Sequence, residues 1–211
     1  MAEKTTPRRG RPRGKDAQNA DRRKRQLLDA AYRSVVKHGL AKTTLATVTA
    51  EADLSQGVAV FYYKTKNALL TALLVDLYES YEANWVAALA TAGDAPLDRL
   101  NALVEADFHP SVCNPNTLAV WFAFWGEQRA TPQYAEVTAK FDANRAAMVQ
   151  GVCRVLFPPE QVDGADELAD WLETLTDGYY QRVHLFPDTF HAEHAIAGAM
   201  AFLERMLPQA D

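Results

Sequence analysis

Aromatic side chains recur at helical spacing in the C-terminal two-thirds of this 211-residue chain. Trp121 and Trp125 are four residues apart, with Phe124 beside them. Tyr81 and Trp85 repeat this spacing earlier in the chain. Residues four apart lie on one face of a helix, so each pair can present two rings to the same neighbour. The pairs therefore predict a ligand pocket, although packing in a hydrophobic core would use the same spacing.

A later segment adds another indole, a carboxylate and two phenol rings, in Trp171 and the run Asp177–Tyr180. Residues 67–211 contain 7 Lys and Arg but 21 Asp and Glu, which slightly favours a cationic ligand. Most of these carboxylates must nevertheless face solvent. The candidate ligand contacts are Tyr81, Trp85, Trp121, Phe124, Trp125, Trp171 and Asp177.

The first third of the chain carries the opposite charge. Residues 1–66 contain 15 Lys and Arg against 6 Asp and Glu, and four of these arginines lie in the stretch PRRGRPRGK at residues 7–15. Such a segment attracts the phosphate backbone of nucleic acid. A solvated charge run without a partner would have the same composition, so charge alone leaves both interpretations open.

No metal or cofactor site is expected. Cys113 and Cys153 are too few and too distant for a disulfide framework or zinc module, and they predict reduced thiols in a cytoplasmic protein. His191 and His194 are three residues apart in HAEH, but no third ligand is evident, so this pattern predicts a surface helix. A charged N-terminus and the absence of a long apolar run predict neither secretion nor a membrane span.

The elements that must position these residues are all predicted to be helices, because no strand-like alternation persists anywhere. Pro, Gly and Asp mark the breaks between them. The expected helices span about 21–39, 45–52, 56–63, 67–91, 97–108, 116–129, 132–156, 164–185 and 189–207. The fold class is therefore all-α, with short helices first and longer ones afterwards.

Residues 22–75 resemble the helix-turn-helix region of the TetR family of transcriptional repressors. The resemblance rests on Gly39, Thr43, Thr44, Ala52, Ser55, Gly57, Tyr62, Tyr63, Lys66, Ala68, Leu69 and Leu70. Three positions depart from the usual pattern, with Thr49 in place of Ala, Asp53 in place of Gly and Val60 in place of Tyr. Asp tolerates the left-handed backbone of such a turn, so Asp53 is compatible with the motif.

The resemblance implies a three-helix DNA-binding domain at residues 21–66 and a larger helical domain for ligand binding and dimerisation at residues 67–211. The second helix of such a motif lies in the major groove, with its N-terminal residues nearest the bases. The expected base contacts are Gln56, Val58, Ala59 and Val60. Core packing is the alternative for the two valines. The other expected DNA contacts, chiefly to phosphates, are Thr43, Thr44, Ser55, Tyr62 and Lys66.

Residues 1–20 are expected to form a disordered basic arm, in which RRGRPRGK resembles an AT-hook. An extended Arg-Gly-Arg-Pro-Arg segment can lie in the narrow minor groove of A·T-rich DNA. Arg9, Arg11 and Arg13 are the expected contacts there. Attraction to phosphates without sequence preference is the alternative.

WFAFW followed by LTDGYYQRVHL resembles the C-terminal domain of the BetI subfamily, the repressors of choline-to-betaine genes. This resemblance implies choline as the inducer, a quaternary ammonium held by aromatic faces and by a carboxylate such as Asp177 or Glu127. Polyamine, aromatic and drug-like ligands remain alternatives, in which case the protein would regulate an efflux or catabolic gene.

The segment AIAGAMAFL at residues 195–203 is apolar on every side, which predicts packing on its own subunit and on a second copy. A homodimer formed by the last two helices is the expected assembly, and a wholly buried core helix is the alternative. We therefore expect a repressor that binds operator DNA as a dimer and is released by a small-molecule inducer.

Two other classes of function are alternatives to this interpretation. An architectural DNA-binding protein would bind no ligand. A helical enzyme is a remote alternative, because the sequence shows no glycine-rich phosphate loop or clear catalytic pair, although a catalytic triad would not show in sequence spacing.

Overall fold

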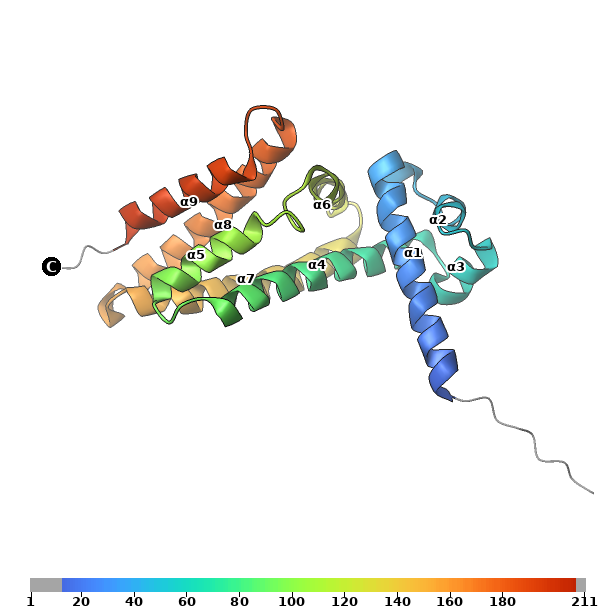
Figure 1. Ribbon diagram of the computed structural model, residues 1–211, viewed down its shortest axis with the longest axis horizontal. Helices are drawn as coiled ribbons and strands as arrows, with labels where there is room; N and C mark the ends of the chain where they lie inside the picture. The colour runs from blue at the N-terminus through green and yellow to red at the C-terminus, as the bar shows by residue number, and fades with distance from the viewer. Residues whose placement is uncertain (1–12, 208–211) are drawn as a thin grey trace, which may run out of the picture.

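The computed structural model describes residues 13–207, with the side chains of residues 17–207. This part of the chain holds nine α-helices and one short 3-10 helix, and it contains no β-strand (Figure 1). The prediction of an all-α fold is confirmed. The α-helices are α1 (Arg13–Lys42), α2 (Leu45–Glu51), α3 (Gln56–Tyr63), α4 (Lys66–Thr91), α5 (Pro96–Asp107), α6 (Pro115–Glu127), α7 (Pro132–Leu156), α8 (Val162–Leu185) and α9 (Ala192–Met206), and the 3-10 helix is η1 (Pro159–Gln161).

The first helix begins earlier than the sequence predicts. Residues 13–20, which the sequence analysis assigns to a disordered arm, are helical. No proline follows Pro12 in this stretch, and alanine, glutamine and arginine favour the helix. The predicted contacts Arg9 and Arg11 lie outside the described residues. Arg13 is the first residue of α1, and its side chain is not described.

Local backbone geometry produces the compact α1–α3 unit. Gly39 has φ 76° and ψ 165°, so the regular helix is interrupted where the sequence predicts its end. Thr44 caps α2 by accepting a hydrogen bond of 3.1 Å from the backbone N–H of Thr47. Asp53 has φ 51° in the turn before α3, the left-handed conformation that the sequence analysis expects it to tolerate.

Two hydrophobic clusters form the interior, and α6 belongs to both. The first cluster contains Leu27 and Ala59 from the α1–α3 unit together with Trp121 and Phe124 from α6. The second cluster contains Leu118 from α6 together with buried residues of α4, α5, α7, α8 and α9. Figure 1 shows α6 lying between α1 and the larger helical unit. This helix therefore connects the two parts of the molecule through packing on both sides.

Polar contacts reinforce the junction between the two parts. Lys66 at the start of α4 donates hydrogen bonds of 2.7 Å to the carbonyl of Leu40 and 2.9 Å to that of Ala41. The hydroxyls of Tyr32 in α1 and Thr117 in α6 lie 3.0 Å apart. Helix α4 begins at this junction and continues into the larger helical unit (Figure 1). The α1–α3 unit therefore contacts the larger unit at several points.

The helices α8 and α9 approach closely at Gly198. A Cβ atom at that position would overlap with the hydroxyl oxygen of Tyr179 and would lie 2.9 Å from the ring carbon that bears it. The ring of Tyr179 cannot withdraw easily, because it stacks on Phe190 with a centroid distance of 5.7 Å. Glycine at position 198 is therefore a packing requirement of this helix pair.

We expect Gly198→Ala to lower the free energy of unfolding by about 1–3 kcal/mol, because the added methyl group overpacks the contact with Tyr179. Gly151→Ala is the matched control, since a Cβ at that exposed helical position meets nothing within 4 Å and alanine favours the helix. Urea unfolding at one fixed protein concentration measures both. Equal stability of the two variants would contradict the packing argument.

Candidate functional site

The helix α3 presents a polar and aromatic face to solvent. Gln56 and Gly57 are exposed at its start, and the side chains of Val60 and Phe61 are 45% and 75% exposed. Ala59 is fully buried in the first cluster, and Val58 packs partly against it. The fold therefore separates the predicted base contacts into an outward set and an inward set.

Three of the predicted DNA contacts are held in other interactions. Thr43 is buried, and its hydroxyl donates to the carbonyl of Gly39 at 2.9 Å and lies 3.2 Å from that of Ser34. Ala59 faces the core, and the ammonium group of Lys66 binds two backbone carbonyls. In these positions Thr43 and Ala59 cannot reach DNA without a rearrangement. The side chain of Lys66 instead holds the start of α4 against the end of α1.

Among the residues with described side chains, the other predicted contacts are at least partly accessible. Thr44, Ser55, Gln56 and Val60 are exposed, and Val58 and Tyr62 are partly buried. The side chain of Ser55 makes no capping hydrogen bond. Phe61 is the most exposed large apolar residue in the described part of the chain, and it is not among the predicted contacts. The sequence could have indicated this exposure, because Phe61 lies four residues after Gly57 and therefore on the same exposed face of the helix.

A second candidate site is a cavity of about 390 Å³ among α4, α6, α7 and α8. Its aromatic lining comes from three of these helices and consists of Tyr78, Tyr81, Trp121, Trp125 and Tyr180. The ring centroids of Tyr78 and Trp121 lie 4.7 Å apart at a steep angle, and those of Trp121 and Trp125 lie 6.2 Å apart. These rings form the aromatic part of the cavity wall.

Carboxylates line the same cavity. They belong to Asp142, Asp170, Glu173 and Asp177, whereas Arg145 is the one cationic side chain among the lining residues. Asp177 is exposed to solvent, yet partial desolvation by the residues around it and the negative charges of Glu173 and Asp142 raise its pKa to about 6. Burial also raises the pKa of Asp142 above its ordinary value. The cavity is therefore lined by acidic groups as well as by aromatic rings.

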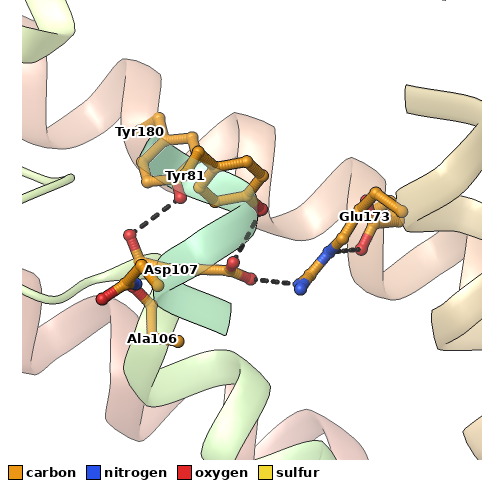
Figure 2. A network of polar contacts seen from close by, with 7 residues as sticks. Tyr81, Ala106, Asp107, Glu173 and Tyr180 are labelled. Atoms are coloured by element: carbon orange, nitrogen blue, oxygen red, sulfur yellow. Dashed lines mark hydrogen bonds and ion pairs between the residues drawn. The ribbon is translucent and has the colours of Figure 1, made fainter. Parts of the chain in front are cut away.

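A buried polar network supports the cavity wall (Figure 2). Asp107 at the end of α5 accepts hydrogen bonds of 2.8 Å from the hydroxyl of Tyr81 and 2.8 Å from Nη2 of Arg145. The hydroxyl of Tyr180 donates to the backbone carbonyl of Asp107 at 2.8 Å, and Nε of Arg145 donates to Glu173 at 3.3 Å. The network fixes the positions of α4, α5, α7 and α8 relative to one another.

The structure brings together four of the seven predicted ligand contacts, namely Tyr81, Trp121, Trp125 and Asp177. The other three do not line the cavity. Phe124 is fully buried against Tyr134, Trp85 lies in the core near the guanidinium of Arg145, and Trp171 is 43% exposed on α8. The alternative carboxylate Glu127 is exposed outside the lining.

The cavity also contains residues outside the predicted contacts, chiefly Tyr78, Asp142, Arg145 and Glu173, and Tyr180 from the run Asp177–Tyr180. For some of them, helical spacing in the sequence could have predicted a place beside the expected contacts. Tyr78 precedes Tyr81 by three residues, and Glu173 and Tyr180 share a helical face with Asp177. Asp142 and Arg145 gave no comparable signal, because α7 carries charged residues on several faces.

The described residues contain no group of three His, Cys, Asp or Glu side chains that could hold a metal ion. Nδ1 of His194 accepts a hydrogen bond of 3.2 Å from the backbone N–H of His191 at the start of α9. Among the residues that the structure describes, no helix is long and apolar enough to cross a membrane.

Comparison with known families gives two matches. Residues 27–73 match the bacterial regulatory proteins of the tetR family, and residues 96–208 match the BetI-type transcriptional repressor, C-terminal. The HTH-type transcriptional regulator BetI of Burkholderia thailandensis is 30% identical over 188 residues, which cover 88% of this chain and 93% of that protein. Its counterpart in Stenotrophomonas maltophilia is 29% identical over 191 residues, covering 89% and 94%.

Solved structures share the fold. A regulator from Pseudomonas aeruginosa PAO1 superposes with a TM-score of 0.78 at 25% identity, covering 88% of this chain and 90% of its own. A regulator from Saccharomonospora viridis in complex with choline gives a TM-score of 0.78 at 21% identity, covering 90% and 100%. The multidrug binding protein EbrR complexed with ethidium gives 0.64 at 22% identity, covering 89% and 99%.

The curated relatives regulate transcription, which decides against the enzyme hypothesis. The two family matches span the helix-turn-helix unit and the helical unit that contains most of the cavity. The protein therefore belongs to the TetR family of transcriptional regulators, with a C-terminal domain of the BetI type.

Proposed function

We propose that the protein represses transcription in the cytoplasm by binding operator DNA as a homodimer, and that a small organic cation, choline or another amine, releases it. The observation that carries this proposal is the convergence of aromatic rings and carboxylates on one cavity whose wall is formed in part by α6. The same helix packs against the α1–α3 unit. A ligand site and a DNA-reading unit thus share one structural element.

The exposed face of α3 supplies the DNA contacts. Gln56 can pair with adenine, and the apolar side chains of Val60 and Phe61 can contact thymine methyl groups. Thr44 and Ser55, both exposed near helix N-termini, suit phosphate contacts. Two such helices in a dimer must match half-sites about one helical turn of DNA apart, so the distance between them sets the operator affinity.

The cavity suits a quaternary ammonium group. Arg145 pairs with Asp107 and Glu173, whereas Asp142, Asp170 and Asp177 make no salt bridge with any described residue. Aromatic faces attract cations by about 0.5–2 kcal/mol each, depending on desolvation. A micromolar complex requires about 8 kcal/mol, so the rings need help from the carboxylates and from enclosure of the ligand.

Trp121 connects the cavity to the DNA-binding unit through its packing. It lines the ligand cavity and belongs to the first hydrophobic cluster. It also lines a separate cleft of about 560 Å³ that lies between α1 and the helices α4 and α6. A ligand that shifts this indole would change the packing of α6 on α1. A coupling of 1–3 kcal/mol is typical of such regulators and suffices to weaken operator binding.

The proposed dimer uses α8 and α9. The outer surface of α8 and its C-terminal end expose Trp171, Leu185 and Phe186, three large apolar side chains that a second copy would cover. Small residues on α9, including the exposed Ala197, permit close approach of another helix. These features support an isologous interface around a two-fold axis.

A larger aromatic cation is the second candidate ligand. The multidrug binding protein EbrR has the same fold and binds ethidium, a planar cation. The tilted pair Trp121 and Trp125 would suit a flat ring system as well as a methylated ammonium group. In that case the regulated gene would concern efflux or catabolism.

The proposal predicts that choline releases the protein from the DNA upstream of its own gene. Fluorescence anisotropy of labelled DNA measures this release as choline and a panel of other amines are titrated. Trp125→Ala should weaken the choline response at least tenfold and leave ligand-free DNA binding unchanged, because Trp125 lines the cavity and belongs to α6, outside the α1–α3 unit. Val155→Ala, at an exposed apolar residue of α7, is the control. Tight DNA binding that no amine disturbs would refute the ligand class.

We expect Phe61→Ala to weaken operator binding by about 1–3 kcal/mol, because the exposed ring loses its contact with DNA. The variant should fold normally, since the ring is 75% exposed. Val155→Ala again serves as the matched control. Anisotropy titrations at one salt concentration give both affinities, and an unchanged value for Phe61→Ala would remove this side chain from the interface.

Choline affinity should fall as the pH is lowered through 6, because the cation binds the ionised form of Asp177, whose pKa is about 6. The ionised fraction falls from about nine-tenths at pH 7 to about one-tenth at pH 5, so up to about a tenfold loss is expected. Asp177→Asn should flatten this dependence. Asp166→Asn, whose carboxylate pairs with Arg154 outside the cavity, should retain it. Isothermal titration calorimetry with choline measures both. A pH dependence in Asp177→Asn as steep as in the unaltered protein would contradict the assignment and would point to Asp107, whose pKa burial also raises to about 6.

A further inference from the structure

The connection between α3 and α4 is a strained turn centred on Lys64. This residue has φ 60° and ψ −47°. The backbone N–H of Thr65 donates to the carbonyl of Tyr63 at 2.6 Å, which closes a γ-turn around Lys64. A residue with a Cβ atom is strained in this conformation, whereas glycine adopts a positive φ readily. The sequence nevertheless places a long, charged side chain there.

The helices on both sides fix this turn. The backbone N–H of Lys64 donates to the carbonyl of Val60 at 3.0 Å, which closes the last turn of α3. The hydroxyl of Thr65 then caps α4 by accepting a hydrogen bond of 3.1 Å from the N–H of Ala68. Lys66, the first residue of α4, binds two backbone carbonyls. Because both helix ends are anchored, residue 64 takes the strained conformation whatever its side chain.

The side chain of Lys64 is exposed, and its ammonium group makes no hydrogen bond and no salt bridge with any described residue. A positive charge at this position does interact favourably with the C-terminal end of α3. That interaction needs no partner molecule, so it is the alternative explanation for a lysine at the turn.

The charge of the helix-turn-helix favours a role in DNA binding instead. Residues 43–65 span α2, α3 and the turns that flank α3, and Lys64 is their one cationic residue beside Glu51 and Asp53. Proteins neutralise the phosphates of DNA chiefly with lysine and arginine. The predicted phosphate contact Lys66 is occupied by backbone carbonyls. Lys64 is therefore the exposed cation that lies nearest in sequence to the DNA-reading helix.

Lys64 also continues the exposed face of α3. Gly57, Phe61 and Lys64 follow one another at spacings of four and three residues, which places them on one side of the helix. All three are exposed. When the N-terminal residues of such a helix lie against the bases, its C-terminal end meets the phosphate backbone, as in homeodomains. Lys64 lies at that end of α3.

We propose that Lys64 binds a phosphate of the operator at the edge of the major groove, and that the γ-turn places its ammonium group there. The inference rests on the proposed function, because it assumes that α3 enters the groove. The group bound is the phosphodiester backbone of double-stranded DNA. Lys64 therefore contributes affinity and register without a base preference.

The first experiment compares unaltered protein with Lys64→Gln, which removes the charge and keeps a side chain. Fluorescence anisotropy with the DNA upstream of the protein's own gene gives the affinity at a series of salt concentrations. Lys64→Gln should bind roughly tenfold more weakly. The slope of log K against log salt concentration should become shallower by about two, because a dimer loses two phosphate contacts. Lys140→Gln, at an exposed lysine of α7, is the matched control and should keep both values.

The outcomes separate the inference from the proposed function. Unchanged affinity and slope in Lys64→Gln would overturn the inference and leave the proposed function intact, with the charge serving only α3. A loss of affinity without a change in slope would also overturn it, because the lysine would then act through the position of α3. Absence of specific DNA binding by the unaltered protein would refute the proposed function itself.

The second experiment uses Lys64→Gly to test the strained turn. Both neutral variants lack the charge, so a difference between them reports the effect of the Cβ atom. Lys64→Gly should unfold a few degrees above Lys64→Gln, as relief of backbone strain predicts for a chain of this size. Both variants should share the weaker DNA binding and the shallower slope. Differential scanning calorimetry at one protein concentration measures the unfolding temperatures, and a value for Lys64→Gly no higher than that for Lys64→Gln would contradict the role of the turn.

Discussion

The buried ion pair between Asp107 and Arg145 is the constraint around which the larger helical unit is organised. Two charges removed from water must be hydrogen-bonded almost completely, or their desolvation would oppose folding. Tyr81 and Glu173 provide further partners, and the backbone carbonyl of Asp107 receives the hydroxyl of Tyr180 (Figure 2). These partners come from α4, α5, α7 and α8, so satisfying the charges requires those helices to adopt one relative arrangement. Three of these helices, α4, α7 and α8, also line the cavity, so the network holds most of its wall in place.

Helix positions were largely accessible from the sequence, because caps and helix breakers are local. Prolines at 96, 115 and 132 stand at the first residues of α5, α6 and α7, and Thr44 caps α2. The site was less accessible, because it depends on how each helix is rotated about its axis. Asp107 and Arg145 are 38 residues apart and meet only through packing of α5 on α7. Phe124 and Trp171 carry suitable rings, yet their helices turn them into the core and into solvent.

The same limit applies to the DNA-reading helix. The family pattern indicates that α3 enters the major groove, but four adjacent residues cannot all face the DNA. Packing against α1 and α4 buries Ala59 and leaves Val60 and Phe61 outside. Thr43 shows a further effect, because its hydroxyl is used by Ser34 and by the carbonyl of Gly39. A residue that matches the sequence motif can thus stabilise the fold of the motif without contacting DNA.

The hydrogen bonds of Lys66 couple the start of α4 to the end of α1. By holding the carbonyls of Leu40 and Ala41, it ties the first turn of α4 to the end of α1, so the two move together. With 26 residues, α4 is about 39 Å long at 1.5 Å per residue. A tilt of one degree about its far end would displace the tied end by roughly 0.7 Å over that length. If ligand binding tilts α4 as the proposed function requires, this length would turn a small rotation into a displacement of the α1–α3 unit that is large compared with the length tolerance of a hydrogen bond.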